Sequence, residues 1–205
     1  MPDAENKFSA LLYRFRGYIL GLIAVSLVLV PPRINGCAIG IVIAVVLYAA
    51  SAFLRVRTRQ FIGEHTRGNV HAADALVTCG AYARVRHPLY ISNTGFALGI
   101  AFFHLGISLW VLPFMLVVLA FEIALSRIED RFLERKFGDV WREWARETPA
   151  FFPWPRVSRG LARDSKHVLP QKSFWQAFFA DSSTWLWLLF CNLLLVLRKV
   201  AVFYV

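Results

Sequence analysis

The sequence has few charged residues for a chain of its length. Only 18% of its 205 residues are Asp, Glu, Lys or Arg, whereas soluble proteins average about 25%. Hydrophobic residues make up 58%, and the mean hydropathy is +0.52. A soluble domain of this size cannot hide so much apolar surface, because its exterior must be largely polar. The composition therefore excludes an ordinary soluble domain, a disordered chain and a low-complexity protein, and it predicts an integral membrane protein of one domain, residues 1–205.

Common nucleotide, hydrolase and metal signatures are also absent. The sequence contains no GxGxxG, Walker loop, HExxH or GxSxG pattern, which argues against kinases, metalloproteases and serine hydrolases. No two of the five histidines stand four residues apart, so we predict no metal site. The three cysteines, Cys37, Cys79 and Cys191, cannot all pair within the chain and form no CxxC, which predicts reduced thiols.

Positive charge is plentiful and unevenly placed. The formal net charge is +10, and residues 1–16, 55–87 and 126–172 hold almost all of the Lys and Arg. Positive residues are retained on the cytoplasmic side of membrane proteins, so these three segments are predicted to be cytoplasmic. This placement predicts no nucleic-acid partner, and contact with anionic membrane lipids is an additional expectation.

Five apolar runs separate the basic segments. They cover residues 17–30, 36–54, 89–103, 107–125 and 185–197. A spanning helix needs about 20 residues. The runs therefore predict an all-α, multi-pass fold with about five transmembrane helices, arranged as two hairpins and a C-terminal helix. Arg198 and Lys199 follow the last run, so that helix is predicted to be a tilted span with snorkelling cations, or alternatively an interfacial helix.

The segment after the fourth run has helical periodicity. Apolar residues recur every three or four positions over residues 126–146, with charged residues between them. The pattern predicts one amphipathic cytoplasmic helix that continues from the fourth span and ends at Thr148-Pro149.

Two polar clusters are candidates for chemistry. The first is Gly-Ala-Tyr-Ala-Arg-Val-Arg-His-Pro-Leu-Tyr, residues 80–90, where a cytoplasmic segment enters the third span. Pro88 suits the first turn of a helix, and a helix N-terminus there would favour an anionic group. The second is Glu129-Asp130, which follows Arg127 at the cytoplasmic end of the fourth span. From the residues alone, the first cluster is equally compatible with a basic flank of a membrane span. The second is also compatible with a solvent-exposed helix face.

Both clusters resemble the signatures of one enzyme family. Residues 76–82, Leu-Val-Thr-Cys-Gly-Ala-Tyr, and 86–90, Arg-His-Pro-Leu-Tyr, resemble the LVTxGPY…RHPxY pattern of the isoprenylcysteine carboxyl methyltransferases. That wider group includes phospholipid methyltransferases. Residues 129–153 resemble the family's second pattern, EExxLxxxFGxxYxxYxxxTPRxxP. The resemblance covers residues 76–153, and residues 154–205 form a C-terminal extension.

Several positions depart from the family pattern. Asp130 replaces a glutamate, two tryptophans replace tyrosines, and Ala150 stands where the family has arginine. The family's catalytic arginine would fall at Leu125, so Arg127 is the nearest candidate. These changes preserve the cofactor half of the pattern better than the substrate half, and they leave the methyl acceptor open.

The resemblance implies transfer of a methyl group from S-adenosylmethionine to a lipophilic acceptor at the cytoplasmic membrane face. It implies that the cofactor is held by Arg86, His87, Pro88, Tyr90 and Glu129. Gly95 and Gly99 would let the cofactor lie along the third helix, and close helix packing is the alternative role for this glycine pair.

The acceptor is predicted to be a prenylated or other lipid carboxylate, with a phospholipid amine or a thiol as alternatives. Arg127 would orient a carboxylate, and Glu129 or Asp130 would take the proton of an amine. An NADPH-dependent sterol-type reductase and a non-catalytic scaffold are further alternatives. The oligomeric state is left open.

Overall fold

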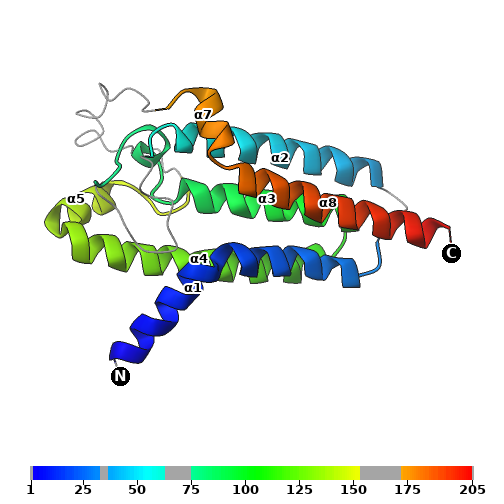
Figure 1. The fold of residues 1–205 in the computed structure, drawn as a ribbon, viewed down its shortest axis with the longest axis horizontal. Helices are drawn as coiled ribbons and strands as arrows, with labels where there is room; N and C mark the ends of the chain where they lie inside the picture. Colours follow the sequence, from blue (N-terminus) through cyan, green and yellow to red (C-terminus); the bar gives the residue numbers. More distant parts are fainter. Residues whose placement is uncertain (1, 33–36, 63–74, 153–171, 205) are drawn as a thin grey trace.

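The described part of the chain is a bundle of long helices with shorter helices gathered at one end (Figure 1). The computed structural model describes residues 2–32, 37–62, 75–152 and 172–204, and these contain no β-strand. Arg33 at the first hairpin tip, Pro153 at the end of the second motif, and residues 63–74 and 153–171 of the predicted cytoplasmic segments lie outside the described residues.

The long helices reproduce the predicted order of apolar runs. They are α1 (Pro2–Ser26), which continues into the 3₁₀ turn η1 (Leu27–Leu29), α2 (Cys37–Arg59), α3 (Pro88–Leu105), α4 (Val111–Phe137) and α8 (Ser182–Phe203). The second predicted hairpin is formed by α3 and α4, which are joined through Gly106. The all-helical class is therefore confirmed.

Four of these helices are long and apolar enough to cross a membrane. They comprise Ser9–Leu29, Ala38–Arg59, Val111–Phe137 and Ser182–Val202. Helix α3 is shorter and carries Ser92, Asn93 and Thr94 in its first half. It packs against α1, α2, α4 and α8, so its polar residues meet protein rather than lipid. The fifth span therefore stays a prediction.

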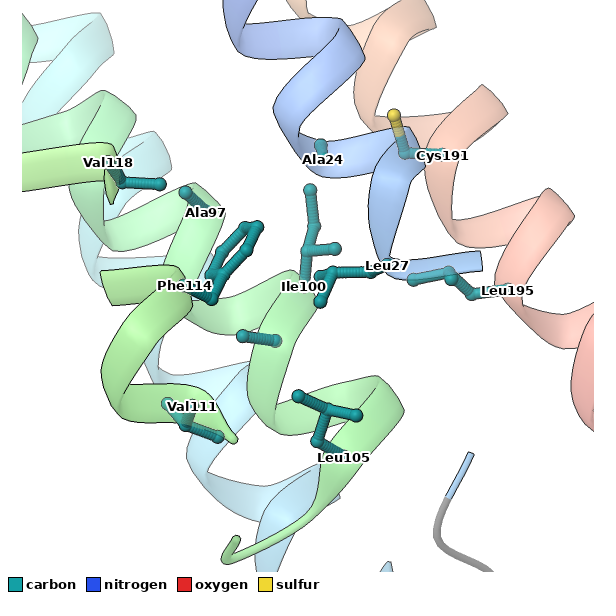
Figure 2. Packing of buried hydrophobic residues seen from close by; sticks show 11 residues of the cluster. Ala24, Leu27, Ala97, Ile100, Leu105, Val111, Phe114, Val118, Cys191 and Leu195 are labelled. Atoms are coloured by element: carbon teal, nitrogen blue, oxygen red, sulfur yellow. The ribbon is translucent and has the colours of Figure 1, made fainter. Parts of the chain in front are cut away.

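The core lies where α1, α3, α4 and α8 meet. Figure 2 shows Ala24, Ile100, Phe114 and Leu195 from these helices, and Leu27 from η1, pointing toward one another. Because lipid tails are as apolar as leucine, close packing rather than water exclusion holds such helices together in a bilayer. The core joins the C-terminal helix to the two hairpins.

The amphipathic segment after the fourth span is two helices, and the prediction of one continuous helix is wrong. Helix α4 runs without interruption to Phe137, and α5 (Asp139–Glu147) follows. Gly138 between them has φ +56°, a left-handed conformation that glycine adopts readily, and its N–H closes α4 on the Glu134 carbonyl. The predicted end of the helical segment at Thr148 is confirmed.

One end of the bundle gathers the shorter elements. These are the 3₁₀ turn η3 (Gly80–Ala83), α5 and α7 (Phe174–Phe179), which lie beside the N-termini of α3 and α8 (Figure 1). At the other end, Lys199 of α8 donates to the Phe103 carbonyl and lies 4.5 Å from that ring's centroid. This contact gives a cation near the far end of the last helix a polar partner.

Candidate functional site

The first motif forms a turn that leads into α3. Gly80 has φ +63°, and a side chain there would overlap the Phe61 ring, so the turn requires glycine. His87 is the N-cap of α3, and Pro88 occupies its first turn as the sequence predicts. This path places Arg86, His87 and Tyr90 at the end of the bundle where the shorter helices gather.

The backbones of the two motifs are paired. The Arg86 N–H donates to the Pro149 carbonyl over 2.8 Å, and the His87 N–H donates to the Ala150 carbonyl over 3.0 Å. The Arg86 guanidinium also donates to the Ala145 carbonyl over 3.3 Å and lies 5.5 Å from the Trp141 ring centroid. Segments about 60 residues apart in sequence thus form one unit.

The side chains of the two motifs meet at Asp130. One carboxylate oxygen lies 3.1 Å from His87 Nε2 and the other 3.3 Å from Arg86 Nη2. Glu129 lies 3.9 Å from His87 Nδ1. The His87 ring is buried between Tyr90 and Phe151, with centroid separations of 5.4 and 5.6 Å. Asp130 therefore links the two motifs through its contacts with Arg86 and His87.

A cavity of about 170 Å³ lies beside this junction. Of the predicted site residues, it is lined by Arg86, His87, Tyr90 and Glu129. Phe132 and Trp144 supply apolar and aromatic walls. The cavity thus brings the predicted cofactor-binding groups of both motifs onto one space.

The polar groups around this cavity suit the cofactor that the family resemblance implies. Arg86 Nε and Trp144 Nε1 are buried donors without a hydrogen-bond partner among the described residues, and a buried unpaired donor is costly. Burial, together with the nearby charge of Glu129, raises the pKa of the Tyr82 phenol, so it remains a donor at neutral pH. Donors beside the carboxylate of Glu129 match S-adenosylmethionine, which carries a carboxylate, an ammonium group and hydroxyls.

The structure does not bring Arg127 to the cavity. Its side chain is exposed, and it is not among the lining residues. Leu125, where the family pattern has an arginine, is fully buried. The orientation of α4 that points Glu129 into the cavity turns Arg127 away. Side chains two positions apart on a helix point in directions that differ by about 200° around its axis.

Gly95 and Gly99 lie against α2 rather than against the cavity. A Cβ on Gly95 would overlap Ser51, and one on Gly99 would lie 2.5 Å from the Tyr48 ring. Neither glycine lines the cavity. This geometry fits the alternative role of the pair in close packing of two helices, and the cofactor role stays a prediction.

Residues from α1 and α2 also line the cavity and were not predicted. They are Tyr13, Arg16, Arg55 and Arg59, and Asn93 of α3 joins them. The sequence marked these arginines as basic flanks of membrane spans, and only the helix packing shows which of them face inward. The sequence did hold one indication. Arg55 and Arg59 are one helical turn apart, which places them on the same face of a helix.

The described residues contain no group of three His, Cys, Asp or Glu side chains placed to hold a metal ion. Cys79 and Cys191 are free and buried.

Comparison with known proteins gives one family and two similar proteins. Residues 39–140 match the phospholipid methyltransferase family. The chain is 37% identical over 109 residues to the cobalt-zinc-cadmium resistance protein CzcN of Cupriavidus metallidurans, covering 53% of this chain and 48% of that protein. It is 36% identical over 107 residues to the nickel-cobalt-cadmium resistance protein NccN of Alcaligenes xylosoxydans xylosoxydans, covering 52% and 47%.

The chain thus spans about half the length of the curated relatives it matches. No solved structure matches it. The family match contains the first motif, the Glu129-Asp130 pair and helices α3 and α4. Residues 39–140 therefore belong to the phospholipid methyltransferase family, which confirms the resemblance to this group of membrane methyltransferases.

Proposed function

We propose that the chain is an S-adenosylmethionine-dependent methyltransferase that acts on a lipophilic acceptor at the cytoplasmic face of a membrane. One observation carries the proposal. The two motifs, separated by about 40 residues, are joined through Asp130 and place Arg86 and Glu129 on one cavity. The family match and the apolar helices support the same reading.

The first motif would hold the anionic part of the cofactor. The Arg86 guanidinium contacts the Ala145 carbonyl and Asp130 through its two terminal nitrogens, and its buried Nε, which has no partner among the described residues, would donate to such a group. The N-terminus of α3, which begins at Pro88, adds a favourable field for negative charge. Glu129 would accept hydrogen bonds from hydroxyls or an ammonium group. When bound, the cofactor supplies a methyl group on a positively charged sulfur.

Methyl transfer also needs a group that holds the acceptor. An acceptor carboxylate is already ionised, so it needs a cation rather than a base, and Arg16 and Arg59 reach the cavity. We therefore assign to them the orienting role predicted for Arg127. An amine acceptor would need to lose a proton, and we assign this step to Glu129 because Asp130 is held by Arg86 and His87.

Methyl transfer is an in-line displacement, so alignment and exclusion of water supply most of the catalysis. Fixing two reactants in such a geometry can contribute on the order of 7–11 kcal/mol. The end of the bundle is suited to this task. A polar cofactor can arrive from the cytoplasm while a lipophilic acceptor arrives from the bilayer, and the basic segments favour the cytoplasmic orientation.

Membranes containing the protein and methyl-labelled S-adenosylmethionine would test the proposal. We expect label to enter the organic extract, and base treatment to release it as methanol if the acceptor is a carboxylate. Arg86→Ala should abolish incorporation, whereas Arg84→Ala should not, because Arg84 is exposed and does not line the cavity. Equal incorporation by both variants would contradict the site, and no incorporation by the folded wild type would contradict the function.

A further inference from the structure

Helix α4 carries a carboxyl group inside the core. Its buried face is formed by residues that recur every three or four positions, among them Val111, Phe114, Val118, Glu122 and Leu125. Glu122 is 1% exposed and lies near the middle of a helix that is apolar enough to cross a membrane. The pattern favours an apolar side chain at this position. An ionisable residue inside a membrane helix is costly and usually has a function.

The Glu122 carboxyl is poorly satisfied. Neither of its oxygens completes a hydrogen bond with any described residue, and an unpaired buried polar group lowers stability. Asn93 of α3 is the polar side chain that approaches it, and the charges of Arg55, Arg16 and Glu129 act on it. Packing alone therefore does not account for an acid here.

The surroundings of Glu122 favour its neutral form. An isolated carboxylate is so costly to bury that it takes up a proton instead. Arg55 is the nearby cation on α2, and its Nε already donates to the carboxylate of Asp181 over 2.7 Å. Its other two nitrogens donate to Asn93 and Thr184 over 2.7 and 3.1 Å. The hydrogen bonds of Arg55 thus go to partners other than Glu122.

Asn93 connects Glu122 to the cavity beside the two motifs. The Asn93 Oδ1 accepts from Arg55 Nη1, so the amide nitrogen of Asn93 is directed to another partner and needs an acceptor there. The carbonyl oxygen of a neutral Glu122 is such an acceptor. Asn93 and Arg55 both line the cavity, whereas Glu122 is not among its lining residues.

We infer that Glu122 is a positioning residue, which as the neutral acid holds the Asn93 amide in the orientation that supports Arg55 at the cavity wall. Without an acceptor on α4, the Asn93 amide would be free to turn over and leave Arg55 Nη1 as an unpaired buried donor. The effect on methyl transfer rests on the proposed function. Glu122 then shapes the wall of a cavity that it does not itself line.

Infrared spectroscopy tests the protonation state. In a maltoside detergent, which contains no carbonyl group, the difference spectrum at neutral pH reports the C=O stretch of a protonated carboxyl. We expect this band to disappear in Glu122→Gln and to remain in Ser126→Ala. Ser126 is a matched control because it is buried on the same helix and its hydroxyl donates to the Ile123 carbonyl. A band that is unchanged in Glu122→Gln would overturn the inference.

Two substitutions separate positioning from a merely structural role. Glu122→Gln keeps the volume and the acceptor oxygen of the neutral acid, so it should bind S-adenosylmethionine like the wild type. Glu122→Leu removes the acceptor and should weaken binding about tenfold. It should not lower the thermal unfolding midpoint, because it also removes an unpaired buried carboxyl. A midpoint that falls together with binding, or a loss of binding in Glu122→Gln, would contradict positioning by the neutral acid.

A double-mutant cycle tests the contact with Asn93 without reference to the cofactor. Glu122→Leu leaves the Asn93 amide without an acceptor, and Asn93→Leu leaves the Glu122 carboxyl without a donor. The double variant removes both groups, so its unfolding midpoint should be higher than the sum of the two single shifts predicts. Additive shifts would show that the two side chains do not act on each other and would refute the inference.

Calorimetry with S-adenosylmethionine distinguishes this inference from the proposed function. If the wild type and Glu122→Leu bind the cofactor equally tightly, the positioning role is wrong and the methyltransferase stands. If the folded wild type binds no cofactor, the proposed function is wrong. The infrared band and the double-mutant cycle then decide whether Glu122 positions Asn93, because neither measurement involves the cofactor.

Discussion

Replacing Asp181 tests how the C-terminal extension is held on the rest of the protein. Asp181 is 2% exposed, and its Oδ2 accepts from Arg55 Nε and Arg59 Nε over 2.7 and 2.9 Å. Asp181→Asn leaves the buried Arg55 guanidinium without its counter-charge. Removing one partner of a buried ion pair costs about 3–5 kcal/mol in the free energy of unfolding. For a chain of this size, that cost corresponds to a fall of roughly 6–20 °C in the unfolding midpoint.

Thermal unfolding in detergent can be followed with a thiol-reactive fluorogenic dye. Cys79 and Cys191 are free and buried, so their reaction reports loss of structure. The matched control is Asp139→Asn, because Asp139 pairs with Arg142 at the surface and should leave the midpoint unchanged. A midpoint for Asp181→Asn that equals the wild-type value would refute the reasoning.

The pH dependence of the Asp181 effect has a definite sign. Burial alone would raise the pKa of this carboxyl, but Arg55 and Arg59 outweigh burial and lower it. A carboxyl with a lowered pKa stabilises the folded state above its unfolded pKa, about 3.9, and loses this contribution as the pH falls through its folded value. The difference in midpoint between wild type and Asp181→Asn should therefore be constant from pH 5 to 8 and shrink below roughly pH 4. A difference that stays constant into strong acid would contradict the ion-pair account.

Two further predictions concern packing and topology. Gly99→Ala should lower stability by about 1–3 kcal/mol in the same unfolding assay, because the added Cβ would lie 2.5 Å from the Tyr48 ring; an unchanged midpoint would remove the packing role. Arg57→Cys and Arg127→Cys should react with a membrane-impermeant maleimide from one side, and Leu109→Cys from the other. Reaction of the two arginine positions from opposite sides would overturn the two-hairpin topology.

The helices were predictable because a long apolar run between basic segments of a membrane protein forms a helix in nearly every case. The start of α3 was predictable as well, since Pro88 is well suited to a first turn. The break at Gly138 was not, because a single glycine inside an apolar periodicity is compatible with either a continuous helix or a new one.

The motif residues were easier to place than the rest of the site. Arg86, His87, Tyr90 and Glu129 stand in recognisable local patterns, and the structure brings them together. The inward positions of Arg16 and Arg59 depend on how each helix is rotated within the bundle, which a basic flank does not encode. For the same reason, Arg127 faces away from the cavity, although it is positively charged and stands beside the Glu129-Asp130 pair in the sequence.

The central claim is that the cavity between the two motifs binds S-adenosylmethionine. Calorimetry on detergent-purified protein tests it most directly, with Glu129→Ala, which removes a lining carboxylate, and Glu134→Ala, at a position that does not line the cavity. We expect micromolar binding by the wild type and by Glu134→Ala, and none by Glu129→Ala. No binding by a wild-type protein that unfolds cooperatively, or equal binding by all three proteins, would contradict the account.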